Sequence, residues 1–161
     1  MLLRSVGPYV RCMNLYRIAK AKYANDLMGT GGLYGPGRWH REGVQILYTA
    51  SSVSLAMLEV LGHWQTSPLG MALVTLHLPD DTNGLLLNVA DLPAAWRSPD
   101  GLPALQQIGM DWLKERMHRI MRVPSVHSPT EFNYLLNPLH SEHATLRIVS
   151  IEPHPFDPRL K

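Results

Sequence analysis

Short apolar runs, separated by turns that contain proline or glycine, recur along the whole chain. Runs rich in β-branched, aromatic or leucine residues predict strands over residues 14–19, 45–50, 73–78, 85–89, 122–126 and 145–152. The last of these runs alternates apolar and polar residues most regularly. Pro124 interrupts its run, which predicts an edge strand or a bulge, because proline cannot donate a ladder hydrogen bond.

Two longer segments carry apolar residues at helical spacing. The first helix is expected to follow a cap at Ser51 or Ser52 and to end near Trp64. The second is expected to run to about Arg119. The stripes that predict them are Val53, Met57, Val60 and Trp64 in the first, and Leu105, Ile108 and Trp112 in the second. A short helix is expected over 23–28, a turn or short helix over 130–137, and loops over 29–37 and 91–101.

This order of elements predicts the fold class. The links between the strands are mostly too short for regular crossover helices. We therefore expect an α+β fold with a mixed, mostly antiparallel sheet and flanking helices. The 161 residues fit one domain, which we assign to 13–161, with residues 1–12 as a leader or extension.

The amino-acid composition argues against several classes of function. The formal net charge is +2 and no run of Lys and Arg is present, which argues against direct nucleic-acid binding. Cys12 is the one cysteine, so a disulfide framework and a cysteine-based zinc site are excluded, and a cytoplasmic location fits. The first residues contain no apolar stretch long enough for a signal peptide or a membrane span, so no membrane association is expected.

The glycine-rich stretch GTGGLYGPG, residues 29–37, comes close to known phosphate-binding patterns but matches none. It lacks the GK[ST] of a P-loop and the third glycine of a Rossmann fingerprint, so a tight turn is the simpler interpretation. Arg38 follows directly and could present its guanidinium to an anion. Arg17 lies inside a predicted strand and needs either a carboxylate partner or a bound anion.

Glu59 interrupts the apolar pattern of the first helix. A half-buried carboxylate is costly unless it is paired or functional, so it either pairs with Arg38 or Arg17 or faces a cleft. Ser125 follows a proline near a strand end, where a serine caps a turn or points into a cleft. The chain has no GxSxG motif, which argues against a hydrolase nucleophile.

His140 and His143 have a spacing seen in metal sites. No third ligand is evident and the HExxH order is missing, so we expect no metal. A turn or the start of a helix at the surface is the favoured interpretation.

Seven short motifs occur in one order along the chain: LYRI, GPGRW, VQILYTASSVSLAMLEVLGH, IGMDWL, RVPSV, EFNYLLNPLH and FDPRL. Together they resemble the RES domain family over residues 14–160. Members of that family are toxins of bacterial toxin–antitoxin pairs, and their fold is similar to that of ADP-ribosyltransferases. The resemblance therefore implies an ADP-ribosyltransferase-like fold and an enzyme that acts on NAD.

Matched motif by motif, the resemblance implies that Glu59, Arg38, Tyr48 and Ser125 are catalytic and that Arg17 is a further characteristic arginine. It implies an NAD-binding set of Arg17, Gly37, Arg38, Trp39 and Tyr48. In these roles Glu59 stabilises the ribosyl cation, the arginines hold the pyrophosphate, and Tyr48 flanks the nicotinamide ring. Ser125 contacts the substrate or keeps Glu59 or an arginine in place.

One departure from the family pattern is visible. His40 stands where many relatives have Asn. It lies beside the GRW motif, so it concerns the positioning of the site rather than its activity.

The function implied is cleavage of the nicotinamide–ribose bond of NAD by hydrolysis or phosphorolysis. NAD is then the substrate, inorganic phosphate is a co-substrate in phosphorolysis, and no cofactor or metal is needed. Mono-ADP-ribosylation of a protein is the alternative in the same chemistry, and an RNA-cleaving toxin or a binding module without turnover are the alternatives of other classes. The implied partner is an Xre-type helix-turn-helix antitoxin, whose complex could also bring copies of the toxin together.

Overall fold

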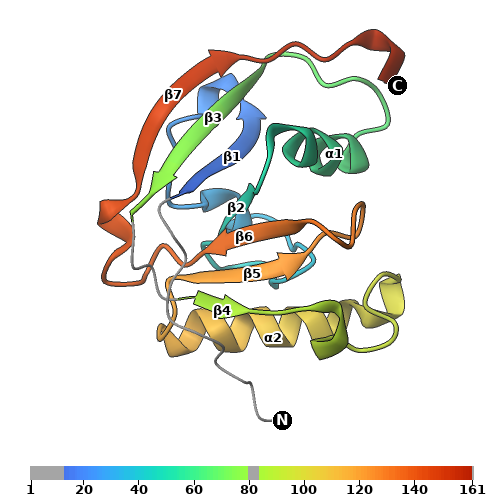
Figure 1. The fold of residues 1–161 in the computed structure, drawn as a ribbon, viewed down its shortest axis with the longest axis vertical. Coiled ribbons are helices and arrows are strands. Elements are labelled where there is room, and N and C mark those ends of the chain that lie inside the picture. The colour runs from blue at the N-terminus through green and yellow to red at the C-terminus, as the bar shows by residue number, and fades with distance from the viewer. Residues whose placement is uncertain (1–12, 80–83, 161) are drawn as a thin grey trace.

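The described residues form one seven-stranded sheet with two α-helices packed against it (Figure 1). The computed structural model describes residues 13–79 and 84–160, so the predicted leader over 1–12, with Cys12, lies outside the described residues. The strands are β1 (Met13–Lys20), β2 (Leu47–Ala50), β3 (Met71–Leu78), β4 (Gly84–Leu86), β5 (Ile120–Pro124), β6 (Phe132–Leu136) and β7 (Arg147–Pro153).

The strand order is β4-β5-β6-β2-β1-β3-β7. Within the described residues, β4 and β5 are the parallel pair and every other neighbouring pair is antiparallel. This confirms the predicted α+β fold with a mixed, mostly antiparallel sheet.

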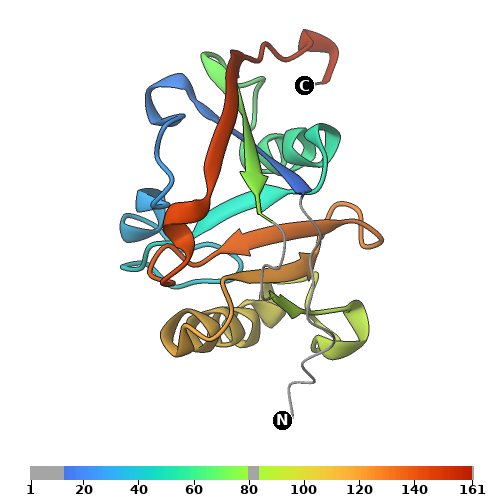
Figure 2. The same cartoon turned by 60° about the vertical axis from the view of Figure 1, so that its left-hand side comes forward.

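The sheet is weakly joined in its middle. β1 pairs with β3 along its whole length, from Met13 opposite Leu78 to Lys20 opposite Met71. Its pairing with β2 on the other side is limited to Tyr16 opposite Ala50. The half with β1, β3 and β7 therefore diverges from the half with β2, β6, β5 and β4, and Figure 2 shows the two halves at a steep angle.

The first helix, α1 (Val53–His63), lies beside the junction of the two halves (Figure 1). Ser52 caps it, as predicted, by accepting the N–H of Leu55 through its hydroxyl over 3.1 Å. The helix predicted from the apolar stripe is present, and its fully buried residues are Leu55, Ala56 and Leu61. Met57 and Val60 of the stripe are partly buried against the same core cluster, and Val60 and Trp64 also line a pocket.

The second helix, α2 (Leu102–Glu115), covers the face of β4 and β5. Its apolar side joins a core cluster with residues of these strands, of β6 and of the segment that follows β4: Leu85, Leu87, Met121, Val123 and Leu135. The helix ends four residues earlier than predicted, because Arg116 adopts the left-handed conformation with a φ of 53°. Arg119, the predicted end, is buried just before β5.

Residues 130–137, predicted as a turn or short helix, contain the interior strand β6. Tyr134, Leu135 and Leu136 are all buried, because the strand is covered on both faces. A strand that is buried on both faces lacks the alternation of apolar and polar residues that marks a half-exposed strand. The hydrophobic pattern therefore did not predict a strand here.

Other predictions differ from the structure in type or in boundaries. The helix predicted over 23–28 is a 3₁₀ turn followed by a loop, because the carboxylate of Asp26 takes the N–H groups of Met28 and Thr30. The strand predicted over 85–89 ends at Leu86. β5 begins before the predicted residue 122, and Pro124 is its last residue.

The predicted edge position of that strand was also wrong. β5 lies between β4 and β6. Its pairing with β4 ends at Arg122, so the missing N–H of Pro124 removes no hydrogen bond between β4 and β5. The short 3₁₀ helices are Ala21–Tyr23, Thr30–Leu33, Val89–Asp91, Pro99–Gly101, His143–Thr145 and Pro158–Leu160.

Candidate active site

A cleft opens where β1 and β2 separate. It consists of two adjoining pockets, one of about 360 Å³ and one of about 960 Å³. The side chains that border both pockets are Arg17, Tyr48, Glu59, His63, Trp64 and Asn133. Two of the residues implied to be catalytic by the family resemblance, Tyr48 and Glu59, therefore face one continuous cavity together with Arg17.

Glu59 points from α1 into this cleft and is fixed through one of its oxygens. Oε1 accepts hydrogen bonds from the Ser125 hydroxyl over 2.7 Å and from Nδ2 of Asn133 over 2.6 Å. Oε2 lies 3.7 Å from Nε2 of His127. Of the two alternatives for Glu59, the structure shows the one in which it faces a cleft: among the described residues, neither Arg38 nor Arg17 pairs with it, and the basic side chain within 4 Å of its carboxylate is the imidazole of His127.

Ser125 supports Glu59 from below the cleft surface. It is 0% exposed and lines neither pocket, so its hydroxyl reaches Glu59 but not the cavity. The same hydroxyl accepts the N–H of His127 over 3.1 Å. Of the two roles considered for Ser125, contact with the substrate or support of Glu59, this geometry favours support.

His127 packs closely against α1. A Cβ atom on Gly62 would lie 2.6 Å from Nε2 of His127, so the absence of a side chain at this helix position gives the imidazole its place. The glycine thereby leaves room for the imidazole ring beside Oε2 of Glu59.

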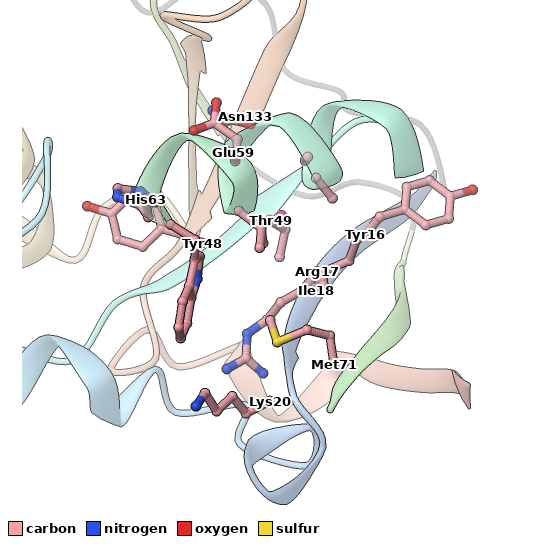
Figure 3. A pocket seen from close by; sticks show the side chains of 14 residues that line it. Tyr16, Arg17, Ile18, Lys20, Tyr48, Thr49, Glu59, His63, Met71 and Asn133 are labelled. Atoms are coloured by element: carbon pink, nitrogen blue, oxygen red, sulfur yellow. The ribbon is translucent and has the colours of Figure 1, made fainter. Parts of the chain in front are cut away.

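Arg17 borders both pockets from β1. Its Nη1 donates to the main-chain carbonyls of Tyr23, over 3.3 Å, and Asp26, over 3.1 Å. Burial lowers the pKa of Arg17, and the negative charge of Asp26 opposes that shift. The carboxylate of Asp26 itself bonds to Thr30 and Met28. Both hydrogen bonds of Arg17 in the described structure thus come from one nitrogen, and the guanidinium extends into the cavity (Figure 3).

Arg38 borders the larger pocket at the end of the glycine-rich loop. Its Nη1 donates to the carbonyl of Trp96 over 2.9 Å, which fixes the guanidinium through a neutral partner and leaves its charge uncompensated there. Trp39, the next residue, is 2% exposed and belongs to the core cluster under α2. The tryptophan anchors the loop, while the arginine faces the cleft.

Gly37 occupies a position where a side chain does not fit. A Cβ atom there would lie 2.6 Å from Cε1 of His40 and 2.8 Å from the Tyr48 hydroxyl. Its carbonyl accepts a hydrogen bond from Nε2 of Gln106, on α2, over 2.9 Å. Gly37 is therefore required by the close packing of the loop on Tyr48.

Tyr48 reaches the cleft from β2, with its hydroxyl turned toward the loop. The hydroxyl lies 2.7 Å from Nδ1 of His40 and accepts the N–H of Trp39 over 3.3 Å. Burial raises the pKa of Tyr48, despite the opposing effects of the Trp39 N–H and the charge of Arg38. A phenol in this state stays protonated, so Tyr48 serves through its ring and its hydrogen bonds rather than as a base.

The sequence did not single out several cleft residues. Asn133 and His127 contact Glu59, and Lys20 and His63 line the cavity. A signal existed for Asn133, a polar residue inside the apolar run FNYLL. Nothing in the sequence pointed to Lys20, because its place in the site depends on a tertiary contact: its ammonium lies 5.1 Å from the ring centroid of Trp64.

The predicted histidine pair is not part of the cleft. Nε2 of His143 bonds to the carbonyl of Leu27 over 2.8 Å, and the N–H of Glu142 donates to Nδ1 of His140. A 3₁₀ helix begins here as expected, but the surface position was wrong for His143, which is buried. In the parts of the chain that the structure describes, no three His, Cys, Asp or Glu side chains gather as metal ligands.

Comparison with known proteins agrees with this architecture. The sequence profile of the RES domain matches residues 14–157. The chain belongs to the RES domain family. It is 40% identical over 153 residues to Toxin Res of Yersinia enterocolitica, with 92% of this chain and 100% of that protein covered. It is also 32% identical over 146 residues to the Prs ADP-ribosylating toxin of a Sphingobium species, with 88% and 91% covered.

The fold of this RES domain also resembles a solved structure. A chain in the crystal structure of the M. tuberculosis MbcT-MbcA toxin–antitoxin complex superposes with a TM-score of 0.73 at 18% identity. The match covers 95% of this chain and 89% of that one. No helix within the described ranges of the RES domain has the length and apolar character needed to cross a membrane.

The charges in the smaller pocket are separated. Arg17 and Lys20 lie toward one side of the cavity, and Glu59 with Asn133 toward the other (Figure 3). A ligand with an anionic part and a part that develops positive charge fits this separation. Arg38 adds a third cation on the side of the larger pocket.

Proposed function

We propose that this RES domain is the toxin of a toxin–antitoxin pair and that it cleaves the nicotinamide–ribose bond of NAD. The observation that carries the proposal is a single carboxylate, Glu59, held by Ser125 and Asn133 in a cleft whose other side presents Arg17. Membership of the RES domain family and the 32% identity to a toxin named as ADP-ribosylating support it.

The proposed chemistry needs one negative charge near the ribose. Nicotinamide leaves NAD as a neutral molecule, so its departure requires no general acid. The ribose meanwhile develops oxocarbenium character, as in glycoside cleavage. With Oε1 of Glu59 occupied by two donors, Oε2 is the oxygen available to stabilise that charge.

The cations have the complementary task in this proposal. The pyrophosphate of NAD carries two negative charges, and arginine forms charge-assisted, often bidentate hydrogen bonds with such groups. Arg17 and Arg38 are each fixed by main-chain carbonyls, which do not neutralise them. Tyr48 flanks the nicotinamide ring with its own ring, because its hydroxyl is occupied within the protein.

The acceptor of the ADP-ribosyl group distinguishes two candidate reactions. Water or inorganic phosphate as acceptor gives breakdown of NAD, which is the first candidate. A protein side chain as acceptor gives mono-ADP-ribosylation, which is favoured by the name of the Sphingobium relative. The same carboxylate and cations serve both reactions.

The proposed partner is an antitoxin of the Xre-type helix-turn-helix class, and the proposed place of action is the cytoplasm, where NAD is consumed. The similarity in fold to a chain from a toxin–antitoxin complex supports the existence of an antitoxin. Copies of the toxin are brought together through the antitoxin in this proposal, without direct contact to nucleic acid or membrane.

The test is NMR of purified, partner-free protein incubated with NAD, with and without phosphate. Nicotinamide with free ADP-ribose indicates hydrolysis, and an ADP-ribose phosphate that forms only with phosphate indicates phosphorolysis. Release of nicotinamide with the ADP-ribosyl group retained on a protein, followed with NAD that is labelled in its ADP-ribose part, indicates ADP-ribosylation. No release of nicotinamide by folded protein, with or without a cell extract as acceptor, contradicts the proposal.

A further inference from the structure

His40 lies between the glycine-rich loop and β2, and it borders the larger pocket. It is 4% exposed, and both of its ring nitrogens lie within hydrogen-bond distance of a partner. Nε2 is 3.0 Å from the carbonyl oxygen of Gly35, and Nδ1 is 2.7 Å from the hydroxyl of Tyr48. The imidazole therefore bridges the loop and the tyrosine.

These two partners determine the tautomer. A carbonyl oxygen can only accept, so Nε2 of His40 must carry the proton that is donated to Gly35. In a neutral imidazole Nδ1 is then the acceptor, and Tyr48 must donate its hydroxyl proton to it. Burial lowers the pKa of His40, which is consistent with a neutral ring, although the bond to Gly35 opposes that shift.

The orientation of the Tyr48 hydroxyl is thereby fixed on both sides. It donates to His40 and accepts from the N–H of Trp39, whose side chain is held in the core. The packing around these groups is tight, since a Cβ atom on Gly37 would lie within 2.8 Å of both the His40 ring and the Tyr48 hydroxyl. The tyrosine ring borders both pockets in this orientation.

We propose that His40, as the Nε2-protonated neutral tautomer anchored on the Gly35 carbonyl, is the residue that positions Tyr48 against the substrate. This inference rests on the proposed function, in which Tyr48 flanks the nicotinamide ring. His40 acts through Tyr48 and is not itself a catalytic residue.

The residue type matters for this role. A replacement must donate to the Gly35 carbonyl and accept from Tyr48 at the same time. The amide of glutamine offers both a donor and an acceptor on a side chain long enough to span the two partners, whereas alanine offers neither. His40→Gln and His40→Ala therefore separate the hydrogen-bonding role from the simple presence of a residue.

The kinetic test is a double-mutant cycle between His40 and Tyr48, read as kcat/KM for nicotinamide release. His40→Ala is expected to lower kcat/KM about tenfold or more, because small misplacements of an active-site group have effects of this size. In a Tyr48→Phe background, which lacks the bonded hydroxyl, His40→Ala is expected to have little further effect. His40→Gln is expected to recover most of the activity.

The matched control is His143→Gln. His143 is also buried and also bonds through Nε2 to a carbonyl, that of Leu27, but it lines neither pocket. Its replacement is expected to lower the melting temperature without lowering kcat/KM of the folded fraction. Equal losses from His40→Ala in the wild-type and Tyr48→Phe backgrounds overturn the proposal.

An NMR measurement tests the tautomer without any enzymatic activity. In histidine-¹⁵N-labelled protein, the His40 signals, assigned by their loss in His40→Gln, are expected to show Nε2 protonated and Nδ1 bare. The opposite tautomer or a charged ring at neutral pH overturns the proposal. Absence of NAD turnover by the wild type overturns the proposed function and this role with it, whereas turnover that His40→Ala leaves intact overturns this role alone.

Discussion

Asn133 donates its side-chain N–H to Oε1 of Glu59 over 2.6 Å, although 74 residues separate the two in the sequence. The hydroxyl of Ser125 reaches the same oxygen from a position 66 residues away. One residue lies on β6 and the other directly after β5, so two neighbouring strands hold one carboxylate oxygen of α1. The other oxygen, Oε2, lies 3.7 Å from Nε2 of His127.

Replacing the carboxylate tests the central assignment. Glu59→Gln keeps the size of the side chain and can still bond to Ser125 and Asn133, but it removes the charge that stabilises the ribosyl cation. We expect nicotinamide release to fall by about 10²–10³-fold. The measurement is nicotinamide release by NMR, with the thermal melting curve as the control for folding. Full turnover by the folded variant would show that Glu59 is not the catalytic carboxylate.

Removing a support should have a smaller effect than removing the carboxylate. Ser125→Ala deletes one hydrogen bond to a charged group, worth about 1.5 kcal/mol, and should lower kcat by roughly tenfold with little change in KM. Steady-state kinetics on NAD measures both constants. Ser150→Ala, on β7 and outside both pockets, is the matched control. A change confined to KM would instead indicate that Ser125 contacts the substrate.

Arg38 should contribute mainly to substrate binding. Arg38→Ala removes a charge-assisted interaction with the pyrophosphate, so KM for NAD should rise by roughly tenfold while kcat changes less. Arg159→Ala is the control, because that arginine is exposed and pairs with Asp157 near the end of the chain. An unchanged KM for Arg38→Ala would exclude the anion-binding role.

Two glycines of the same loop should tolerate alanine differently. Gly37→Ala places a Cβ atom against His40 and Tyr48, whereas a Cβ atom on Gly31 meets nothing within 4 Å. We expect Gly37→Ala to lower the melting temperature by about 3 °C or more, as overpacking costs of about 1–3 kcal/mol imply, and Gly31→Ala to leave it nearly unchanged. Differential scanning calorimetry compares the two. Equal melting temperatures would show that the loop can yield at Gly37.

Stability should fall on acidification. Burial lowers the pKa values of His40 and His143, so the folded state binds protons less readily than the unfolded chain, where histidine titrates near about 6.5. The free energy of unfolding should therefore be highest above about pH 6.5 and decrease below it, by at most about 1.4 kcal/mol per pH unit for each histidine. Urea unfolding between pH 8 and 5 measures this, and His143→Gln should reduce the slope. A flat profile would contradict it.

The sequence predicted those features whose causes are local. Ser52 precedes an apolar helix and caps it, and Glu59 is anomalous in an apolar pattern because it serves a cleft. The partners of Glu59 could not be predicted, since they depend on which strands become neighbours in the sheet.

Hydrogen bonds to main-chain carbonyls could not be predicted from the residue types either. The carbonyls of Tyr23 and Asp26, rather than a carboxylate, satisfy Arg17. The strand β6 was missed for a related reason, because burial on both faces removes the alternation that would have revealed it.

The loop that carries Arg38 and His40 is supported from behind by α2. Gln106 bonds to the carbonyl of Gly37, Gln107 accepts a hydrogen bond from Arg41, and a Cβ atom on Gly109 would overlap the carbonyl oxygen of Trp39. At Gly109 the helix backbone thus rests directly on the backbone of the loop. We therefore expect any displacement of α2 to be transmitted to the loop that carries Arg38 and His40, at a distance from the entrance of the cleft.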